Sequence, residues 1–188
     1  MITDNFPFEE FKVYDEWMPD RVDELFIAES PPENGYFYDV DFPGTGRVSD
    51  NIFKLLSIDV RMPKSSKLTA FKRENRFLTD VIKCRKRASV RAPKSLALFS
   101  GRELLGEEVN ALSPRTIILL GRLALAGLRQ AEGFRNIGGG KSVVDLAGTQ
   151  ERIKASAREY RIVYSIFPSC ANIRNYGEEL FERAFSLI

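Results

Sequence analysis

Residues 29–38 carry acidic, hydroxyl and aromatic side chains directly after the apolar run 25–28. The run has the length and composition of a buried strand, and Pro31-Pro32 must end it because proline fixes φ and lacks an N–H. Polar groups at the carboxyl end of a buried strand are typical of sites in α/β proteins. A structural turn with packed aromatic side chains is the alternative. The residues concerned are Glu29, Ser30, Glu33, Tyr36, Phe37 and Tyr38.

The composition excludes several kinds of chemistry. The 188 residues include no histidine, which removes His-based triads, His general bases and imidazole metal ligands. Cys84 and Cys170 are too few for a disulfide framework or a four-thiolate metal site. The stretch Gly138–Ser142 resembles a phosphate-binding loop, but Arg135 stands where that motif has its first glycine. We therefore expect a flexible loop there and no metal.

The charges are unevenly distributed along the chain. Residues 1–50 hold thirteen Asp and Glu against three Lys and Arg, whereas residues 61–94 hold twelve Lys and Arg against two acids. Such asymmetry indicates a polyanionic partner. A solvated basic loop is the alternative, and the sequence leaves both open.

The apolar pattern predicts four strands that alternate with helices. A chain with 44% hydrophobic residues can bury the core of one domain over residues 1–188, on which residues 1–22 pack as an arm. Strands that alternate with helices favour a parallel sheet between two helical layers, a three-layer α/β/α fold. We expect an exposed loop over residues 62–74. The expected strands are 24–29, 77–84, 116–121 and 160–166. The expected helices are 50–58, 95–111, 122–132 and 175–187, and residues 143–158 are expected to include a further, poorly defined one.

The chain has no apolar run of eighteen residues and no hydrophobic signal core near its acidic N-terminus. We therefore expect no membrane partner, a cytoplasmic location and a monomer.

Four stretches together resemble the uracil-DNA glycosylase superfamily. Residues 28–33 (AESPPE) are similar to the Gly-Glu-Ala-Pro-Gly-Glu motif of its iron–sulphur branch, and residues 77–85 (FLTDVIKCR) are similar to that branch's second strand. Residues 104–121 match its helix and third strand in pattern. Residues 166–169 (IFPS) stand where the family has His-Pro-Ser. The resemblance spans about residues 24–187.

The resemblance implies a four-stranded parallel sheet with its site at the carboxyl ends, and a nucleotide that leaves the stack and enters a pocket. Tyr36, Phe37 or Tyr38 would stack on the flipped base, contributing about 1–3 kcal/mol. Asp80 occupies the place of the Asn that reads the uracil edge. The other implied DNA contacts are phosphate contacts by Lys83, Arg85, Lys86 and Arg87, and strand contacts by Phe167, Ser169, Asn172 and Arg174.

The chain departs from the family pattern at catalytic positions. Ser30 cannot supply the anion that several branches place there, so Glu33 is the first candidate for positioning water and stabilising an oxocarbenium ion, and Glu29 the second. Phe167 replaces the histidine that donates to the departing uracil, and losing one such donor raises a barrier by about 2.7–4 kcal/mol.

An ionised Asp80 would only accept hydrogen bonds, which would favour an amine-bearing base over uracil. Of the cluster cysteines only Cys84 has a counterpart, so we predict no iron–sulphur cluster and no cofactor, because hydrolysis needs only water.

Three functions remain open from the sequence. The first is a DNA glycosylase that hydrolyses the N-glycosidic bond of a deaminated or mismatched base, uracil or a related one. The second is a nucleic-acid-binding protein of the same fold that has lost the chemistry. The third is a small-molecule enzyme or interaction domain, because a fold does not fix a function.

Overall fold

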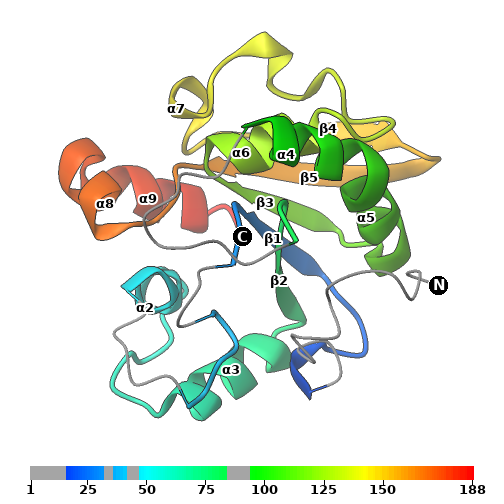
Figure 1. The fold of residues 1–188 in the computed structure, drawn as a ribbon. Helices are drawn as coiled ribbons and strands as arrows, with labels where there is room; N and C mark the ends of the chain where they lie inside the picture. The colour runs from blue at the N-terminus through cyan, green and yellow to red at the C-terminus, as the bar shows by residue number, and fades with distance from the viewer. Residues whose placement is uncertain (1–15, 32–35, 42–46, 84–93) are drawn as a thin grey trace.

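The computed structural model describes residues 16–31, 36–41, 47–83 and 94–188. Its centre is a five-stranded sheet with the strand order β2-β1-β3-β5-β4 (Figure 1). The first three of these strands and β5 run parallel, and β4 pairs with β5 in the antiparallel direction. The strands are β1 (Glu24–Ala28), β2 (Arg76–Asp80), β3 (Thr116–Leu120), β4 (Gln150–Ala155) and β5 (Arg158–Ser165).

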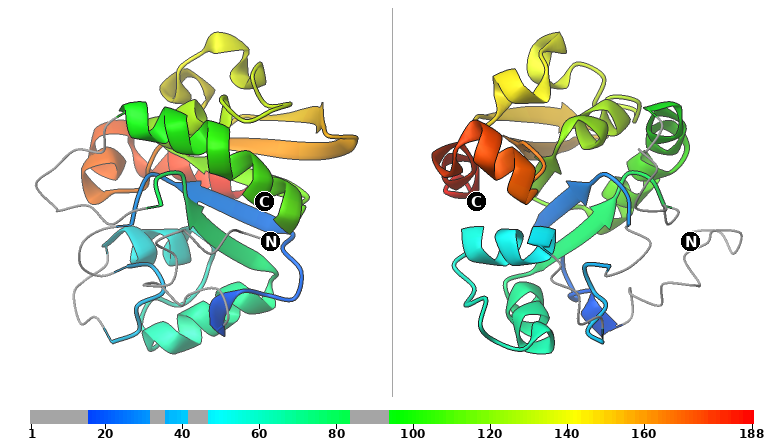
Figure 2. Two further views of the ribbon diagram at one scale, coloured as in Figure 1. Left: turned by 45° about the vertical axis from the view of Figure 1, so that its right-hand side comes forward. Right: turned by 60° about the vertical axis from the view of Figure 1, so that its left-hand side comes forward.

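Helices cover both faces of the sheet, so the predicted three-layer α/β/α arrangement is confirmed (Figure 2). Their bounds in the described residues are α2 (Arg47–Leu55), α3 (Lys64–Arg73), α4 (Lys94–Ser100), α5 (Gly106–Leu112), α6 (Arg122–Leu128), α7 (Val143–Leu146), α8 (Cys170–Tyr176) and α9 (Glu178–Phe185). On one face Phe26 of β1 packs against Phe71 of α3 and Phe185 of α9, with ring centroids 5.4 and 6.1 Å away. On the other face Thr79 of β2 donates a hydrogen bond to Glu108 of α5.

The register of the parallel strands brings the residues that follow them to one edge. Ala28 at the end of β1 lies beside Asp80 at the end of β2, and Leu120 at the end of β3 lies beside Ser165 at the end of β5. These strands are buried almost throughout, as expected of a parallel sheet covered on both faces. The side chains just after the strands therefore meet at the carboxyl edge.

Residues 143–158 include the predicted helix as the short α7, but also a strand that was not predicted. Gln150–Ala155 is the edge strand β4, which forms a hairpin with β5. Ser156 and Ala157 turn the hairpin with φ of 48° and 65°, the left-handed conformation that two-residue hairpin turns require. Glycine and asparagine usually mark such turns, and neither occurs here. The sequence therefore lacked the ordinary hairpin signal.

The predicted loop over residues 62–74 is also wrong, because most of it forms α3. The helix buries Lys67, Leu68 and Phe71 on one face, at the i, i+1 and i+4 spacing of a helix that packs on a core. Because the segment is rich in lysine, this narrow apolar stripe was not recognised in the sequence. The single helix predicted over residues 95–111 is continuous but not regular, since a π-helical turn at Gly101–Leu105 joins α4 to α5.

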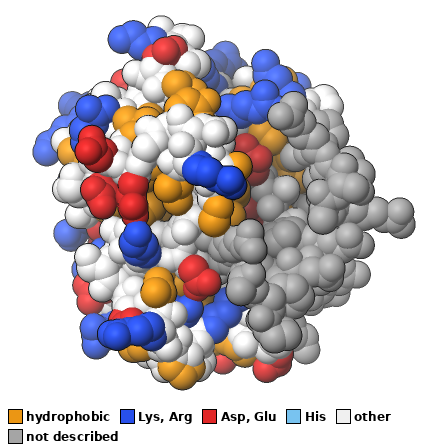
Figure 3. Space-filling model, turned by 90° about the vertical axis from the view of Figure 1, so that its left-hand side faces the viewer, with side chains coloured by type: hydrophobic (Ala, Val, Ile, Leu, Met, Phe, Trp, Pro, Cys, Tyr) orange, Lys and Arg blue, Asp and Glu red, His pale blue; other side chains and the backbone are white. Residues whose placement is uncertain are grey.

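The basic segment pairs with the acidic segment inside the molecule. Arg76 of β2 forms an ion pair with Glu24 of β1, with 2.6 Å between Nε and Oε2. The ammonium of Lys64 donates to the backbone oxygens of Tyr36, at 2.9 Å, and Asp39. On the side where α2 and α8 lie in Figure 1, basic side chains are interspersed with acidic and hydrophobic ones (Figure 3). Part of the charge asymmetry in the sequence thus serves internal pairing.

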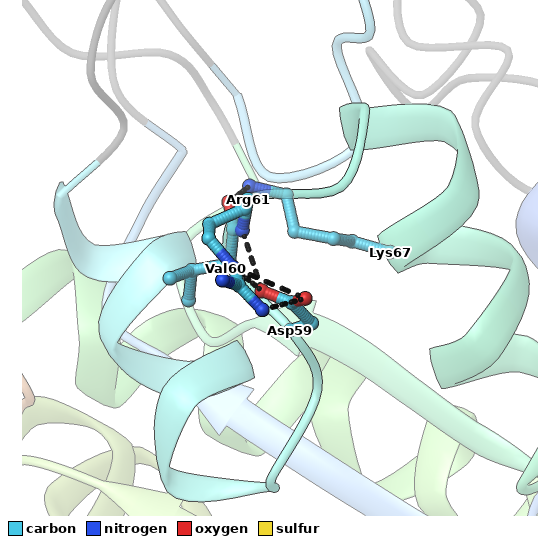
Figure 4. A network of polar contacts seen from close by, with 4 residues as sticks. All are labelled: Asp59, Val60, Arg61 and Lys67. Carbon is cyan, nitrogen blue, oxygen red and sulfur yellow. Dashed lines mark hydrogen bonds and ion pairs between the residues drawn. The ribbon is translucent and has the colours of Figure 1, made fainter.

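Lys67 of α3 forms a second ion pair between the basic and the acidic segment. Its side chain is buried, and its ammonium donates to Asp50 at 2.7 Å. The ammonium also donates to the Val60 backbone oxygen at 3.2 Å, and Figure 4 shows this side of its surroundings. Beside it, the Arg61 guanidinium holds the Asp59 carboxylate at 2.9 Å and lowers the pKa of that carboxyl to about 2. The Lys67 contact with Val60 ties the connection between α2 and α3 to the buried face of α3, whereas the Arg61–Asp59 pair is exposed.

None of the helices in the described part of the chain combines the length and the apolar character that a membrane crossing requires.

Candidate active site

A cavity of about 640 Å³ opens where three parallel strands end. Glu29 follows β1, Gly121 follows β3, and Phe167 lies two residues beyond β5, and all three line the cavity. Side chains of α6, α7 and α8 complete the wall. The carboxyl edge of a parallel sheet is where α/β proteins bind ligands, and this cavity lies there.

The backbone at Gly121 brings two of these side chains together. Its φ of +94° is one that side-chain-bearing residues rarely adopt. A Cβ at this position would lie 3.0 Å from the Cβ of Phe167 and 3.2 Å from Oε1 of Glu29. Glu29 and Phe167 therefore converge over the Gly121 backbone, and a glycine is what allows them this close.

The loop that carries Phe167 is fixed by several hydrogen bonds. The Asn172 amide donates to the Phe167 backbone oxygen at 2.8 Å, and the Ser169 hydroxyl caps α8 by accepting from the Asn172 backbone N–H. From α2, the Asn51 amide donates to the Pro168 backbone oxygen at 2.8 Å. Ser169 and Asn172, which the sequence assigned to DNA contact, thus position the loop. Arg174 is exposed on α8.

Asp80 is a buried acid at the end of β2. Asp80 is only 5% exposed, and its Oδ2 has no hydrogen-bond partner among the described residues. Burial raises the pKa of this carboxyl to about 7, and the charges of Glu108 and Glu29 act in the same direction against the opposing charge of Lys83.

The predicted phosphate contact by Lys83 does not fit the structure. Lys83 is buried, and its ammonium forms an ion pair with Glu108 of α5 and donates to the Thr79 hydroxyl at 2.6 Å. The Thr79 hydroxyl in turn donates to Glu108 at 2.8 Å. A cation held in this way is unavailable to a DNA backbone. The sequence pattern placed Lys83 at a strand end but could not show which partner would neutralise it.

The three aromatic residues predicted to stack on a base differ in exposure. Phe37 is buried between Phe53 and Phe71, each with its ring centroid 5.3 Å away. Tyr38 is buried, and its hydroxyl accepts from the Leu78 N–H at 2.7 Å and donates to the Leu78 oxygen at 3.1 Å. Both serve the core, which does not fit a stacking role. Tyr36 is only partly buried and keeps surface for a contact.

Ser30 follows Glu29 and is partly buried. Several other predicted site residues lie outside the described residues: Glu33, Arg85, Lys86 and Arg87, as well as Cys84. Cys170 is exposed at the start of α8. Within the described ranges, no three acidic or cysteine side chains come together as metal ligands would.

Sequence reasoning missed several side chains that line the cavity, among them three basic ones and a tyrosine. Lys94, Arg122 and Arg129 bring three positive charges to a wall on which Glu29 is the acid, and Tyr176 of α8 lies exposed beside them. The position of Arg122, immediately after Gly121, was a usable signal, because residues that follow parallel strands face the site. Lys94, Arg129 and Tyr176 lie at the start of α4, just after α6 and at the end of α8, and the approach of these helix ends to the cavity depends on packing.

This geometry agrees with a comparison against protein families. The chain matches the Uracil DNA glycosylase superfamily over residues 19–186. It belongs to this superfamily. The match covers all five strands, so the edge that carries Glu29, Asp80, Gly121 and Phe167 lies inside the matched region. A search of curated proteins gives no match to the chain.

Proposed function

We propose that this superfamily member is a DNA glycosylase that flips a deaminated or mismatched base, uracil or a related one, and hydrolyses its N-glycosidic bond. The observation that carries the proposal is the position of Glu29 on the cavity wall, where both it and Phe167 approach Gly121. The cavity volume of about 640 Å³ lies within the usual range for sites that bind small ligands and can admit one nucleotide.

The proposed chemistry needs a carboxylate beside the sugar. When the glycosidic bond breaks, positive charge develops on the sugar ring, and a nearby carboxylate stabilises it and orients the attacking water. Glu29 is the described carboxylate on the cavity wall. Glu33 remains the first candidate from the sequence, and base release by variants of Glu29 and Glu33 distinguishes the two.

Release of the base is the harder half of the reaction for this chain. The departing base carries negative charge, and Phe167 cannot donate a hydrogen bond to it. Arg122 lies on the same cavity wall and supplies a positive charge that favours an anionic leaving group. Arg122 is the candidate for the role that histidine fills by resemblance.

DNA is the proposed partner, single- or double-stranded. Lys94 and Arg122 are exposed at the cavity and are suited to phosphate groups, which bind cations without regard to sequence. Tyr36 and Tyr176 keep aromatic surface for base stacking. We place the protein in the cytoplasm as a monomer.

The absence of histidine from the sequence, together with Phe167 on the cavity wall, favours one second candidate function, a nucleic-acid-binding protein without catalysis. In that case the cavity would hold an extruded base and leave its bond intact.

Base release from labelled oligonucleotides tests the proposal. Each oligonucleotide carries one uracil, hypoxanthine, xanthine or mismatched thymine, in single- and double-stranded form. The variants are Glu29→Gln and Glu33→Gln, with Glu132→Gln as an exposed control. We expect release by the wild-type protein and the control, and its loss in whichever of the two Glu variants removes the catalytic carboxylate. Binding without release on every substrate would support the non-catalytic function.

A further inference from the structure

The cavity extends well beyond the strand ends at its inner part. One face of α6 forms a long stretch of its wall, and the residues of that face are Arg122, Leu125, Ala126 and Arg129. Their i, i+3, i+4 and i+7 spacing is that of one side of a helix. At about 1.5 Å of rise per residue, Arg122 and Arg129 lie about 10 Å apart along the helix axis. The cavity is therefore a groove that begins at the sheet edge and follows α6 to its end.

The far end of this groove, which we call the outer groove, is lined by Arg129, by Val144 of α7 and by Tyr176 of α8. Its α7 wall is anchored to the end of α6. The Arg129 guanidinium donates to the backbone oxygens of Ile137 at 3.0 Å and Lys141 at 2.8 Å, at the two ends of the turn that leads into α7. Both acceptors are uncharged, so these bonds fix the guanidinium without neutralising it. The outer groove thus has a fixed wall that carries a positive charge.

The outer groove also presents apolar and aromatic surface to solvent. Val144 and Tyr176 are each 45% exposed, and they are two of five large hydrophobic side chains that are exposed in the described part of the chain. The helices that carry them, α7 and α8, lie on the same side of the molecule (Figure 1). An accessible aromatic ring beside a cavity suits a nucleobase, because every base has a π-face that can stack on it.

The charges of the lining favour a polyanionic chain in the groove. Lys94, Arg122 and Arg129 contribute three positive charges, and Glu29 contributes one negative charge. Successive nucleotides of a stacked strand are about 3.4 Å apart, so a groove about 10 Å long spans more than one of them. Basic side chains together with an exposed aromatic ring are the combination by which proteins bind single-stranded nucleic acids.

We propose that the outer groove binds the nucleotide next to the flipped one, with its base stacked on Tyr176, and that the substrate is therefore single-stranded DNA. This inference rests on the proposed function, which places the flipped nucleotide at Glu29 and Gly121, and it narrows the substrate to one strand form. In a duplex the neighbouring base is stacked and paired, so it would have to leave the helix as well, at a further cost in free energy. In a single strand most of that cost is absent.

The experiment measures binding of single-stranded oligonucleotides that carry one 2′-fluoro-2′-deoxyuridine, in which the fluorine disfavours positive charge on the sugar and prevents hydrolysis. In matched oligonucleotides the nucleotide on its 5′ side or on its 3′ side is replaced by an abasic-site analogue, which removes the base and keeps the phosphate. For the wild-type protein we expect the affinity to fall about 10-fold when the base on one of the two sides is removed.

Variants of two exposed aromatic residues show whether Tyr176 holds that base. Tyr176→Ala should bind the intact oligonucleotide about 10-fold more weakly than the wild-type protein and lose nothing further when the neighbouring base is removed. Tyr176→Phe keeps the ring and should behave as the wild-type protein. Phe99→Ala is the control, because Phe99 is 52% exposed and is not among the residues that line the cavity. It should keep the full dependence on the neighbouring base.

Three results would overturn the proposal. The first is an unchanged wild-type affinity after removal of either neighbouring base, and the second is an equal loss in Tyr176→Ala and the wild-type protein. The third is a duplex with the same modified nucleotide that binds as tightly as the single strand at the same salt concentration, since we expect it to bind at least about 10-fold more weakly. Base release is judged separately. Dependence on the neighbouring base without base release leaves this inference standing and refutes the proposed glycosylase, whereas base release without that dependence does the opposite.

Discussion

Glu29 and Phe167 approach the same backbone position, Gly121, from the two strands that flank β3. This brings a carboxylate and the Cβ of an apolar residue next to one glycine on the wall of the cavity. It depends on a residue without a side chain, because a Cβ there would meet both groups within 3.0–3.2 Å. The geometry of the proposed site therefore rests on Gly121 as much as on the groups that act.

Gly121→Ala should disturb this arrangement. The strained φ is expected to lower the free energy of unfolding by about 1–3 kcal/mol, and the added methyl should push Glu29 or Phe167 aside. Urea denaturation and base release are the measurements. Gly139→Ala is the control, since its φ of +52° brings backbone strain without any neighbour within 4 Å. Equal loss of base release in both variants would show that the contact over Gly121 is unimportant.

Removing one partner of the buried Lys83–Glu108 ion pair should destabilise the protein. Lys83→Met or Glu108→Gln alone leaves an unpaired buried charge, so each should lower the free energy of unfolding by about 3–5 kcal/mol. The double variant should lose much less than the sum of the two. A double-mutant cycle by urea denaturation measures this coupling, and additive losses would contradict it.

Asp80 should make stability depend on pH. Its pKa is about 7 in the folded protein and ordinary in the unfolded chain, so the folded state holds the proton more tightly. The stabilisation that comes from the Asp80 proton is fully present below about pH 4 and declines as the pH rises to about 7. Above that pH the group causes no further change in stability. The full change is on the order of 4 kcal/mol, from the size of the pKa shift. Urea denaturation from pH 4 to pH 8 should show the decline in the wild-type protein and a flatter profile in Asp80→Asn.

Lys94 and Arg122 should contribute to DNA affinity through phosphate contacts. Replacing either with Gln should weaken binding to all sequences and reduce the salt slope by about one. Fluorescence anisotropy over a range of salt concentrations measures both effects. Arg158→Gln, at the exposed start of β5, is the matched control and should leave the slope unchanged. An unchanged slope in the Lys94 and Arg122 variants would remove the cavity rim from the DNA surface.

The β4–β5 hairpin should gain stability from a better turn. Ser156→Asn together with Ala157→Gly supplies residues that adopt positive φ without strain, so the free energy of unfolding should rise by about 0.5–1 kcal/mol. Thermal and urea denaturation are the checks. A decrease would mean that Ser156 and Ala157 have another role in the hairpin.

The sequence by itself predicted the parallel core and the succession of its strands along the chain. Four apolar runs separated by helical patterns predict the strands β1, β2, β3 and β5, because burial on both faces leaves a continuous apolar signal. It also predicted that Glu29 and Phe167 would lie at strand ends, where the edge of a parallel sheet gathers them. Asp80 fell inside the predicted strand 77–84, whereas the structure ends β2 at Asp80. The sequence did not predict the edge strand β4, because this strand is half exposed and its turn lacks glycine.

Only the tertiary structure decided which charges and rings are available to a ligand. Lys67 and Lys83 look like solvent-exposed cations in the sequence, yet each is buried against a carboxylate from a distant segment. Tyr38 and Phe37 follow a turn but fill the core. Burial also decides the protonation of Asp80, because desolvation depends on every neighbour that excludes water and no local pattern records those neighbours.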